Sequence, residues 1–107
     1  MAQFDDRERG EEARFAHDAE LQFKAEARRN KLLGIWAAEL MSLTGQAAIA
    51  YAADVVASDF TAAGEEDVFR KVADDLKTKG LSVSEAVIRQ KMVQLKTIAK
   101  EQVLKEG

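Results

Sequence analysis

The stretch from Phe15 to Leu43 constrains the fold most, because it places apolar residues at helical spacing and contains no proline. These residues lie mostly three or four positions apart, with one wider step around Asn30. Such spacing puts them on one face of an α-helix that turns toward a core. At ~1.5 Å per residue, a helix of this length would be roughly 45 Å long. The residues expected to face inward are Phe15, Ala19, Phe23, Ala27, Leu33, Trp36, Ala37 and Leu40.

Gly34 stands inside this predicted helix, where glycine weakens helical structure. We expect a neighbouring backbone to pass close to it, with a kink as the other explanation. Trp36 and Tyr51 could form an aromatic site, but residues of this kind more often pack in a core or at its boundary.

Three further helices are predicted, over residues 46–62, residues 65–78, and from a capping box at Ser82 with Glu85 to Leu104. Gly64 and Gly80 are expected to end the second and third helices. The inward-facing residues would be Ile49, Ala52, Ala53, Val56 and Phe60, then Val68, Phe69, Val72 and Leu76, and last Ile88, Met92, Leu95, Ala99 and Val103. With no proline in the chain and short turns, the sequence predicts an all-α protein, a four-helix bundle over residues 15–107.

Residues 1–14 are predicted to form a flexible polar arm in front of the bundle. They hold five carboxylates and three arginines, and Gly10 lowers their helix propensity. Alone in water the arm would be disordered or a frayed helix. Opposite charges four residues apart, such as Asp5 and Arg9, would support a helix once a partner covers it. The pattern therefore suits folding on binding, although an ordinary disordered terminus has a similar composition.

Composition excludes several classes of protein. The chain has 19 acidic and 16 basic residues, a net charge of −3, which argues against nucleic-acid binding. It has no cysteine, so disulfides and thiolate chemistry are excluded. No apolar run is long enough for membrane insertion and no signal peptide is seen, so we expect a cytoplasmic protein. We also expect the free protein to be a monomer.

Few residues could carry chemistry. His17 is the single histidine and lies beside Asp18, which is too little for a metal site. The acidic pairs lack features that would raise a carboxyl pKa, and no nucleophile stands with a base. The sequence therefore indicates no enzyme activity.

Basic side chains gather in one predicted helix. They could form a docking patch for an acidic protein surface or for nucleotide phosphates. The alternative is a solvated helix face that pairs with Glu20 and Glu26. Because no glycine-rich phosphate loop is present, adenine-nucleotide binding would be weak, and no other cofactor is indicated. The residues of this patch are Lys24, Arg28, Arg29 and Lys31.

The sequence also resembles a known family. FDDRER, FAHDAELQFKAEARRNKLLGIWAAEL, GEEDVFRKVADDL and SVSEAVIRQKM are similar to segments of the zeta subunit of the alphaproteobacterial F-type ATP synthase. The resemblance covers nearly the whole chain. It implies a four-helix bundle that inhibits ATP hydrolysis, and a location at the inner membrane through the synthase.

In that family the N-terminal segment is inhibitory. The resemblance implies that it inserts as a helix at a catalytic interface of the alpha and beta subunits, near gamma, while the bundle stays outside. Phe4 and Phe15 would be apolar anchors, and Arg7 and Arg9 would bind carboxylates or carbonyl groups. The matching positions are Phe4, Asp5, Asp6, Arg7, Glu8 and Arg9, and then Phe15, Ala16, His17 and Asp18.

This chain departs from the family where GEEAR follows FDDRER. Gly10 lowers helix propensity and Glu11 replaces an expected apolar contact, so we expect inhibition to be weaker than in the family's best inhibitors, or to be lost. Two alternatives stay open at this point: a small module that binds adenine nucleotide, and a helical adaptor without a link to the ATPase.

Overall fold

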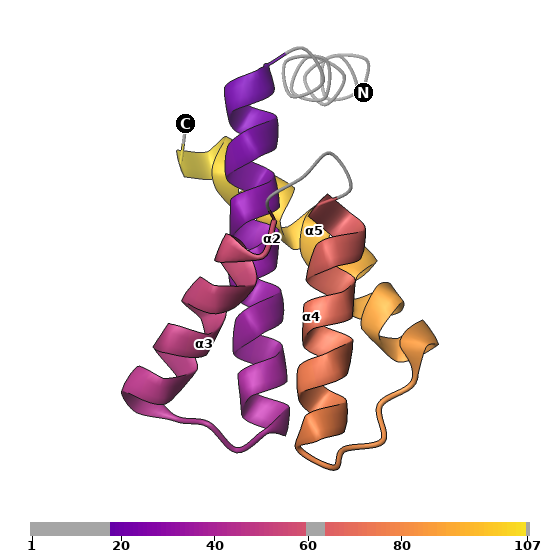
Figure 1. Ribbon diagram of the computed structural model, residues 1–107. Coiled ribbons are helices and arrows are strands. Elements are labelled where there is room, and N and C mark those ends of the chain that lie inside the picture. The colour runs from indigo at the N-terminus through magenta and orange to yellow at the C-terminus, as the bar shows by residue number, and fades with distance from the viewer. Residues whose placement is uncertain (1–17, 60–63, 107) are drawn as a thin grey trace, which may run out of the picture.

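Figure 1 shows a computed structural model, which describes residues 18–59 and 64–106. These two ranges contain four α-helices and no strand, which confirms the predicted all-α bundle. The helices are α2 (Ala19–Leu40), α3 (Gly45–Ala57), α4 (Gly64–Thr78) and α5 (Glu85–Glu106). None of them combines the length and the apolar content that a membrane span requires.

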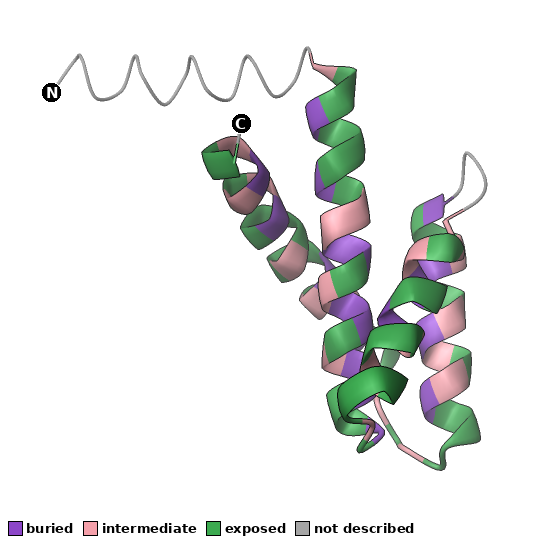
Figure 2. Ribbon diagram, turned by 90° about the vertical axis from the view of Figure 1, so that its left-hand side faces the viewer, coloured by how far each residue is buried: buried purple, intermediate pink, exposed green. Residues whose placement is uncertain are grey.

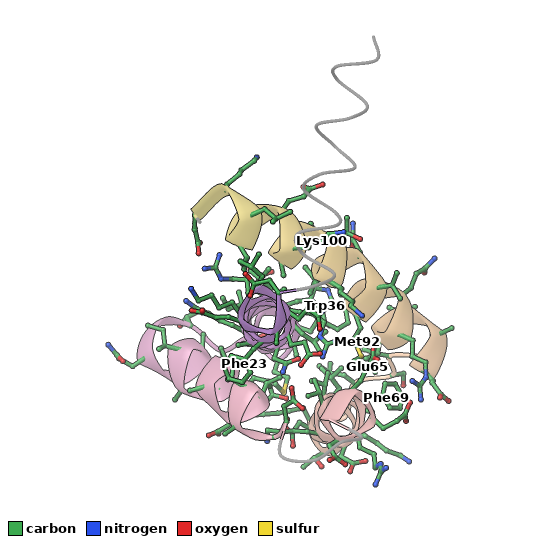
Figure 3. The ribbon with its side chains drawn as sticks, turned by 90° about the horizontal axis from the view of Figure 1, so that it is seen from above. Phe23, Trp36, Glu65, Phe69, Met92 and Lys100 are labelled. Carbon is green, nitrogen blue, oxygen red and sulfur yellow. The ribbon has the colours of Figure 1, made fainter. Side chains whose placement is uncertain are left out.

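The central helix is α2. Helices α3 and α5 pack on it most extensively, and α4 touches all three others. Viewed along α2, α3 and α5 lie on different sides of it and α4 completes the group (Figure 3). Helix α2 is therefore the element against which the other helices are assembled.

Two apolar clusters hold the helices together. The larger one joins the C-terminal half of α2 to the other three helices. The smaller one joins Leu21 and Ala25, near the start of α2, to Val103 near the end of α5. Trp36 and Tyr51 are half-buried against the larger cluster, as predicted for boundary packing. The buried members of the larger cluster are Leu33, Ala37, Met41, Val55, Val68, Val72, Leu76, Ile88 and Met92.

The prediction for Gly34 is confirmed. A Cβ built at this position would lie 2.7 Å from the Cα of Ala52 and 3.3 Å from the Cβ of Val55. Helices α2 and α3 thus cross with backbone against backbone, and only glycine leaves room for this approach.

Several helix ends differ from the prediction. Helix α2 ends at Leu40 rather than Leu43, because Ser42 adopts a left-handed φ of 61°. The N–H of Leu43 then donates to the carbonyl of Ala38 over 2.9 Å, a hydrogen bond typical of a Schellman motif. The sequence concealed this end because a serine, not a glycine, occupies the left-handed position.

Gly80 ends α4 as predicted, with a φ of 79° and the same pattern of hydrogen bonds. The prediction for Gly64 was wrong, since this residue opens α4 and does not stop α3. Helix α3 ends at Ala57, before the predicted Ala62, and residues 60–63 lie outside the described residues.

The capping box was also placed wrongly. Ser84, not Ser82, caps α5, and its Oγ accepts the N–H of Val87 over 3.2 Å. Glu85 accepts from the side chain of Arg89 instead of reaching back to the cap. Only Ser82 has a glutamate three residues later, so the capping-box pattern favoured the wrong serine, whereas Ser84 caps the helix without a box because Val87 stands at the third position.

The predicted inward faces of α4 and α5 are confirmed, with Phe69 and Leu95 at the edge of the core. Those of the other two helices are partly wrong. In α2 the buried residues near the start are Leu21 and Ala25, because α5 lies on that side, while Phe23 is 72% exposed. In α3, Ile49 is 63% exposed and Val55 is buried in its place. Ala19, Leu40 and Ala53 are exposed as well, and Phe15 and Phe60 lie outside the described residues.

We predict that Gly34→Val lowers the free energy of unfolding by about 2 kcal/mol, because overpacking against a backbone costs roughly 1–3 kcal/mol. The matched control is Ala50→Val on the exposed side of α3, which should change it by less than about 0.5 kcal/mol. Urea denaturation followed by circular dichroism measures both. Equal effects of the two variants would contradict a close crossing.

Ser42 and Gly80 offer a second test, because both occupy left-handed helix ends. Ser42→Gly should raise the free energy of unfolding by about 0.5 kcal/mol, since it removes left-handed strain of roughly 1–2 kcal/mol and adds freedom to the unfolded chain. Gly80→Ala should lower it by about 1 kcal/mol. Thermal unfolding would refute the assignment if both variants shifted stability in the same direction.

Candidate functional site

Most of the predicted arm residues lie outside the described residues. This holds for Phe4, Asp5, Asp6, Arg7, Glu8, Arg9, Phe15, Ala16 and His17. The structure does describe the point where the arm joins the bundle, which is Asp18.

Asp18 is the N-cap of α2. Its backbone is extended, with φ −105° and ψ 101°, and its carboxylate accepts the N–H groups of Glu20 and Leu21 over 3.0 and 3.2 Å. The carboxylate also complements the positive end of the helix dipole. A helix formed by the arm would therefore meet α2 at a break and would not run into it, contrary to the prediction of one helix from Phe15 onward.

The first turns of α2 rest on the last turns of α5 (Figure 1). Arg28 extends this contact, since it donates to Gln102 over 2.9 Å and to the Glu106 carboxylate over 2.6 Å. At the end of the bundle where the arm begins, α2 and α5 are thus held together by one apolar cluster and by the two hydrogen bonds of Arg28.

The four basic residues predicted as one patch have different surroundings. Lys24 pairs with Glu20 on the exposed face, at 3.2 Å. Arg28 is engaged with α5, Arg29 is buried, and Lys31 borders a hollow beside α3. The structure does not gather these side chains into a single cluster.

Arg29 and Asn30 are buried and belong to a polar network with two less buried carboxylates. The Nε of Arg29 donates to the Asn30 side-chain oxygen over 3.0 Å, and its guanidinium donates to Glu65 over 3.3 Å. Asn30 in turn donates to the Asp59 carboxylate over 3.1 Å. Figure 3 labels Glu65 at the start of α4. Because Asp59 and Glu65 flank residues 60–63, the network ties both ends of that connection to α2.

Gly64 makes room for this arrangement. A Cβ at that position would collide with the carboxylate of Asp59. No buried side-chain polar atom lacks a hydrogen-bond partner in the described ranges. A buried guanidinium and a buried amide are tolerated here because each of them is satisfied.

The sequence reasoning missed Asn30 as a structural residue. Its signal was the wider step in the apolar spacing of the first helix, which coincides with a polar residue on the buried side. The partners could not be found in the same way, because Asp59 and Glu65 are distant in sequence and look like ordinary surface acids.

We predict that Asn30→Ala lowers the free energy of unfolding by about 2 kcal/mol, because it leaves buried polar groups without partners. Gln94→Ala is the control, since it removes only an exposed hydrogen bond from Lys91; it should cost less than about 0.5 kcal/mol. Chemical denaturation compares the two, and a loss no larger at position 30 than at position 94 would contradict a stabilising network.

Hydrogen bonds between side chains also connect α4 to α3 and to α5. Tyr51 of α3 donates to Asp75 over 2.9 Å, and Lys71 donates to the same oxygen over 3.1 Å. Burial, and then the hydrogen bond to Asp75, raise the pKa of the Tyr51 phenol far above its ordinary value. These groups are engaged with one another and are not aimed at a cavity.

Arg89 of α5 plays the same part on the other side of α4. It donates to both oxygens of Glu66, over 2.8 and 3.1 Å, and lies 4.0 Å from the ring centre of Phe69. These hydrogen bonds lower the pKa of the Glu66 carboxyl. No group of three residues that could hold a metal ion is found among the described residues.

Comparison with known proteins decides the family. The chain matches, over residues 1–102, the family model described as ATPase inhibitor subunit zeta. This chain belongs to that family. The match starts at residue 1, so the arm of this zeta-family protein lies within the matched range together with the bundle.

One solved structure supports the fold. It is a solution NMR structure with 52% sequence identity, and the match covers 81% of this chain and 99% of that chain, with a TM-score of 0.71. No curated protein matches the chain. The family match confirms the resemblance seen in the sequence. It also supports a role for this chain as an inhibitor that associates with ATP synthase.

Proposed function

We propose that this zeta-family protein inhibits ATP hydrolysis by inserting residues 1–14 into a catalytic interface of the ATP synthase head. The observation that carries the proposal is the family match, which spans the arm as well as the bundle. The interface would be formed by the alpha and beta subunits, near the gamma subunit.

The chemistry of the arm supports this role. Its five carboxylates and three arginines leave little to bury in a core, so a charged and dry interface is the setting that would order it. Arg7 and Arg9 would form charge-assisted hydrogen bonds with acidic groups of the head. Phe4 and Phe15 would be the apolar anchors, since aromatic side chains carry much of the energy at interfaces.

The size of the bundle supports the expectation that only the arm enters the interface and that the bundle stays outside. Its two shorter dimensions are 27 and 26 Å, whereas a single helix with its side chains is only about 10–12 Å wide. An interface that admits a helical arm would therefore stop the bundle at its mouth. A body held there would obstruct rotation in the direction of hydrolysis, while rotation in the direction of synthesis would expel the arm.

We predict that deletion of residues 1–14 abolishes inhibition and leaves the fold intact. The buried contacts of the described bundle begin at Leu21, so the far-ultraviolet spectrum and the free energy of unfolding should change little. ATP hydrolysis by the purified head, titrated with the full-length or the truncated protein, measures the effect.

A double variant, Arg7→Ala with Arg9→Ala, should raise the half-inhibitory concentration by about tenfold or more, because charged hydrogen bonds are lost. Arg70→Ala, which changes an exposed arginine of α4, is the control and should inhibit as the native protein does. Full potency of the truncated protein would refute the arm as the inhibitory segment.

A further inference from the structure

Helix α3 is the least covered helix of the described bundle. Figure 2 shows it mostly in the colour of exposed residues. Only Ala52 and Val55 are buried, and Asp54 is its one charged residue. A helix this apolar is normally covered on most sides, and an exposed apolar face marks an interaction surface. Its exposed apolar residues are Ala47, Ile49, Ala50, Ala53 and Ala57.

The surface between α2 and α3 forms a hollow of about 680 Å³. Ile35 of α2 and Ile49 and Val56 of α3 are its walls, and alanines of α3 complete the lining. Lys31 is its single charged lining residue. Ile35 is 37% exposed and Ile49 is 63% exposed, so apolar surface that could pack on another protein stays open to water.

The hollow continues toward the start of α2. Val56 also lines a second, smaller hollow, together with Phe23, Ala27, Asn30 and the acidic residues Glu26 and Asp59. Figure 3 shows Phe23 on the side of α2 that faces α3. Phe23, Ala27, Lys31 and Ile35 follow one another at steps of four. They mark a groove roughly 18 Å long, enough for about three turns of a helix. We refer to the two hollows together as the α2–α3 groove.

We propose that the α2–α3 groove binds a helix of the ATP synthase head, next to the interface that takes the arm. This inference rests on the proposed function. The occupant is an amphipathic helix with apolar residues at steps of three or four and a carboxylate beside them. The alanines of α3 allow its backbone to approach closely.

Position favours the head as the partner. Phe23 lies five residues after Asp18, about 7 Å along the helix, so the groove opens directly behind the arm. A head that holds the arm meets this part of the bundle first.

Charge gives a second reason. Lys31 forms no ion pair in the described part of the chain. A carboxylate of the partner would pair with it in the larger hollow, where every other lining residue is apolar, whereas Glu26 and Asp59 make the smaller hollow acidic.

The two contacts would have different effects on inhibition. The arm blocks rotation, whereas the groove adds affinity because both sites are engaged by one molecule. Damage to the groove should therefore raise the half-inhibitory concentration and leave maximal inhibition unchanged.

The test compares Ile49→Glu with Val93→Glu in the full-length protein. Val93 lies on α5, outside the groove, and is 66% exposed, close to the 63% of Ile49. Ile49→Glu should raise the half-inhibitory concentration by about tenfold, and Val93→Glu should change it by less than about twofold. Circular dichroism confirms that both variants are folded.

Equal potency of Ile49→Glu and Val93→Glu overturns the groove proposal while inhibition by the native protein stands. If the native protein does not inhibit at all, the proposed function fails first, and the inference fails with it. Lys31→Glu should also weaken inhibition by about fivefold or more, whereas its control Lys96→Glu, at an exposed lysine of α5, should not.

A cross-link identifies the occupant. Because the chain has no cysteine, Ala53→Cys supplies one site for a photoreactive maleimide, and Val93→Cys is the control. A product that joins position 53 to a subunit of the head supports the proposal. A product within the same chain, a product with a second copy, or no product beyond the control overturns it.

Discussion

The contact between Gly34 and Ala52 determines how the rest of the structure is arranged. At this crossing the two backbones come close enough that a methyl group on α2 would collide with the Cα of its neighbour. This close approach holds α3 against the central helix α2. The contact with α2, however, covers only a narrow strip of the surface of α3. The remaining apolar surface of that helix stays open, and the groove proposed as a docking site is a direct result.

The fold was predictable from the sequence to a large extent, and the reasons are local. Each signal that predicted a helix correctly lies within that helix or at its end. For α4 these signals are its acidic start, its basic close and the glycine at position 80. For α5 the signal is the spacing of Ile88, Met92, Ala99 and Val103. Errors arose where a neighbour decides the outcome. Whether Phe23 or Leu21 faces inward depends on the side that α5 takes, and no residue near position 23 encodes that choice.

The candidate site was less predictable for the same reason. The arm could be recognised by composition and by resemblance, yet the contacts proposed for it lie in another protein. The basic residues looked alike in sequence, and only the packing of α5 and α4 distinguishes exposed Lys24 from buried Arg29. Asn30 left a trace in the apolar spacing, whereas its partner Asp59 left none, because an aspartate after a helix is common on any protein surface.

The extended backbone at Asp18 has a mechanical consequence. If α2 were continuous with a helical arm, the two would form one rigid rod, and the depth of insertion would dictate the orientation of the whole bundle. Because the N-cap residue is extended, the axis of a helical arm would not have to follow the axis of α2. In the proposed complex, the bundle would then be free to turn until its side, not only its tip, lies against the ATP synthase head, while an inserted arm keeps its own angle of entry.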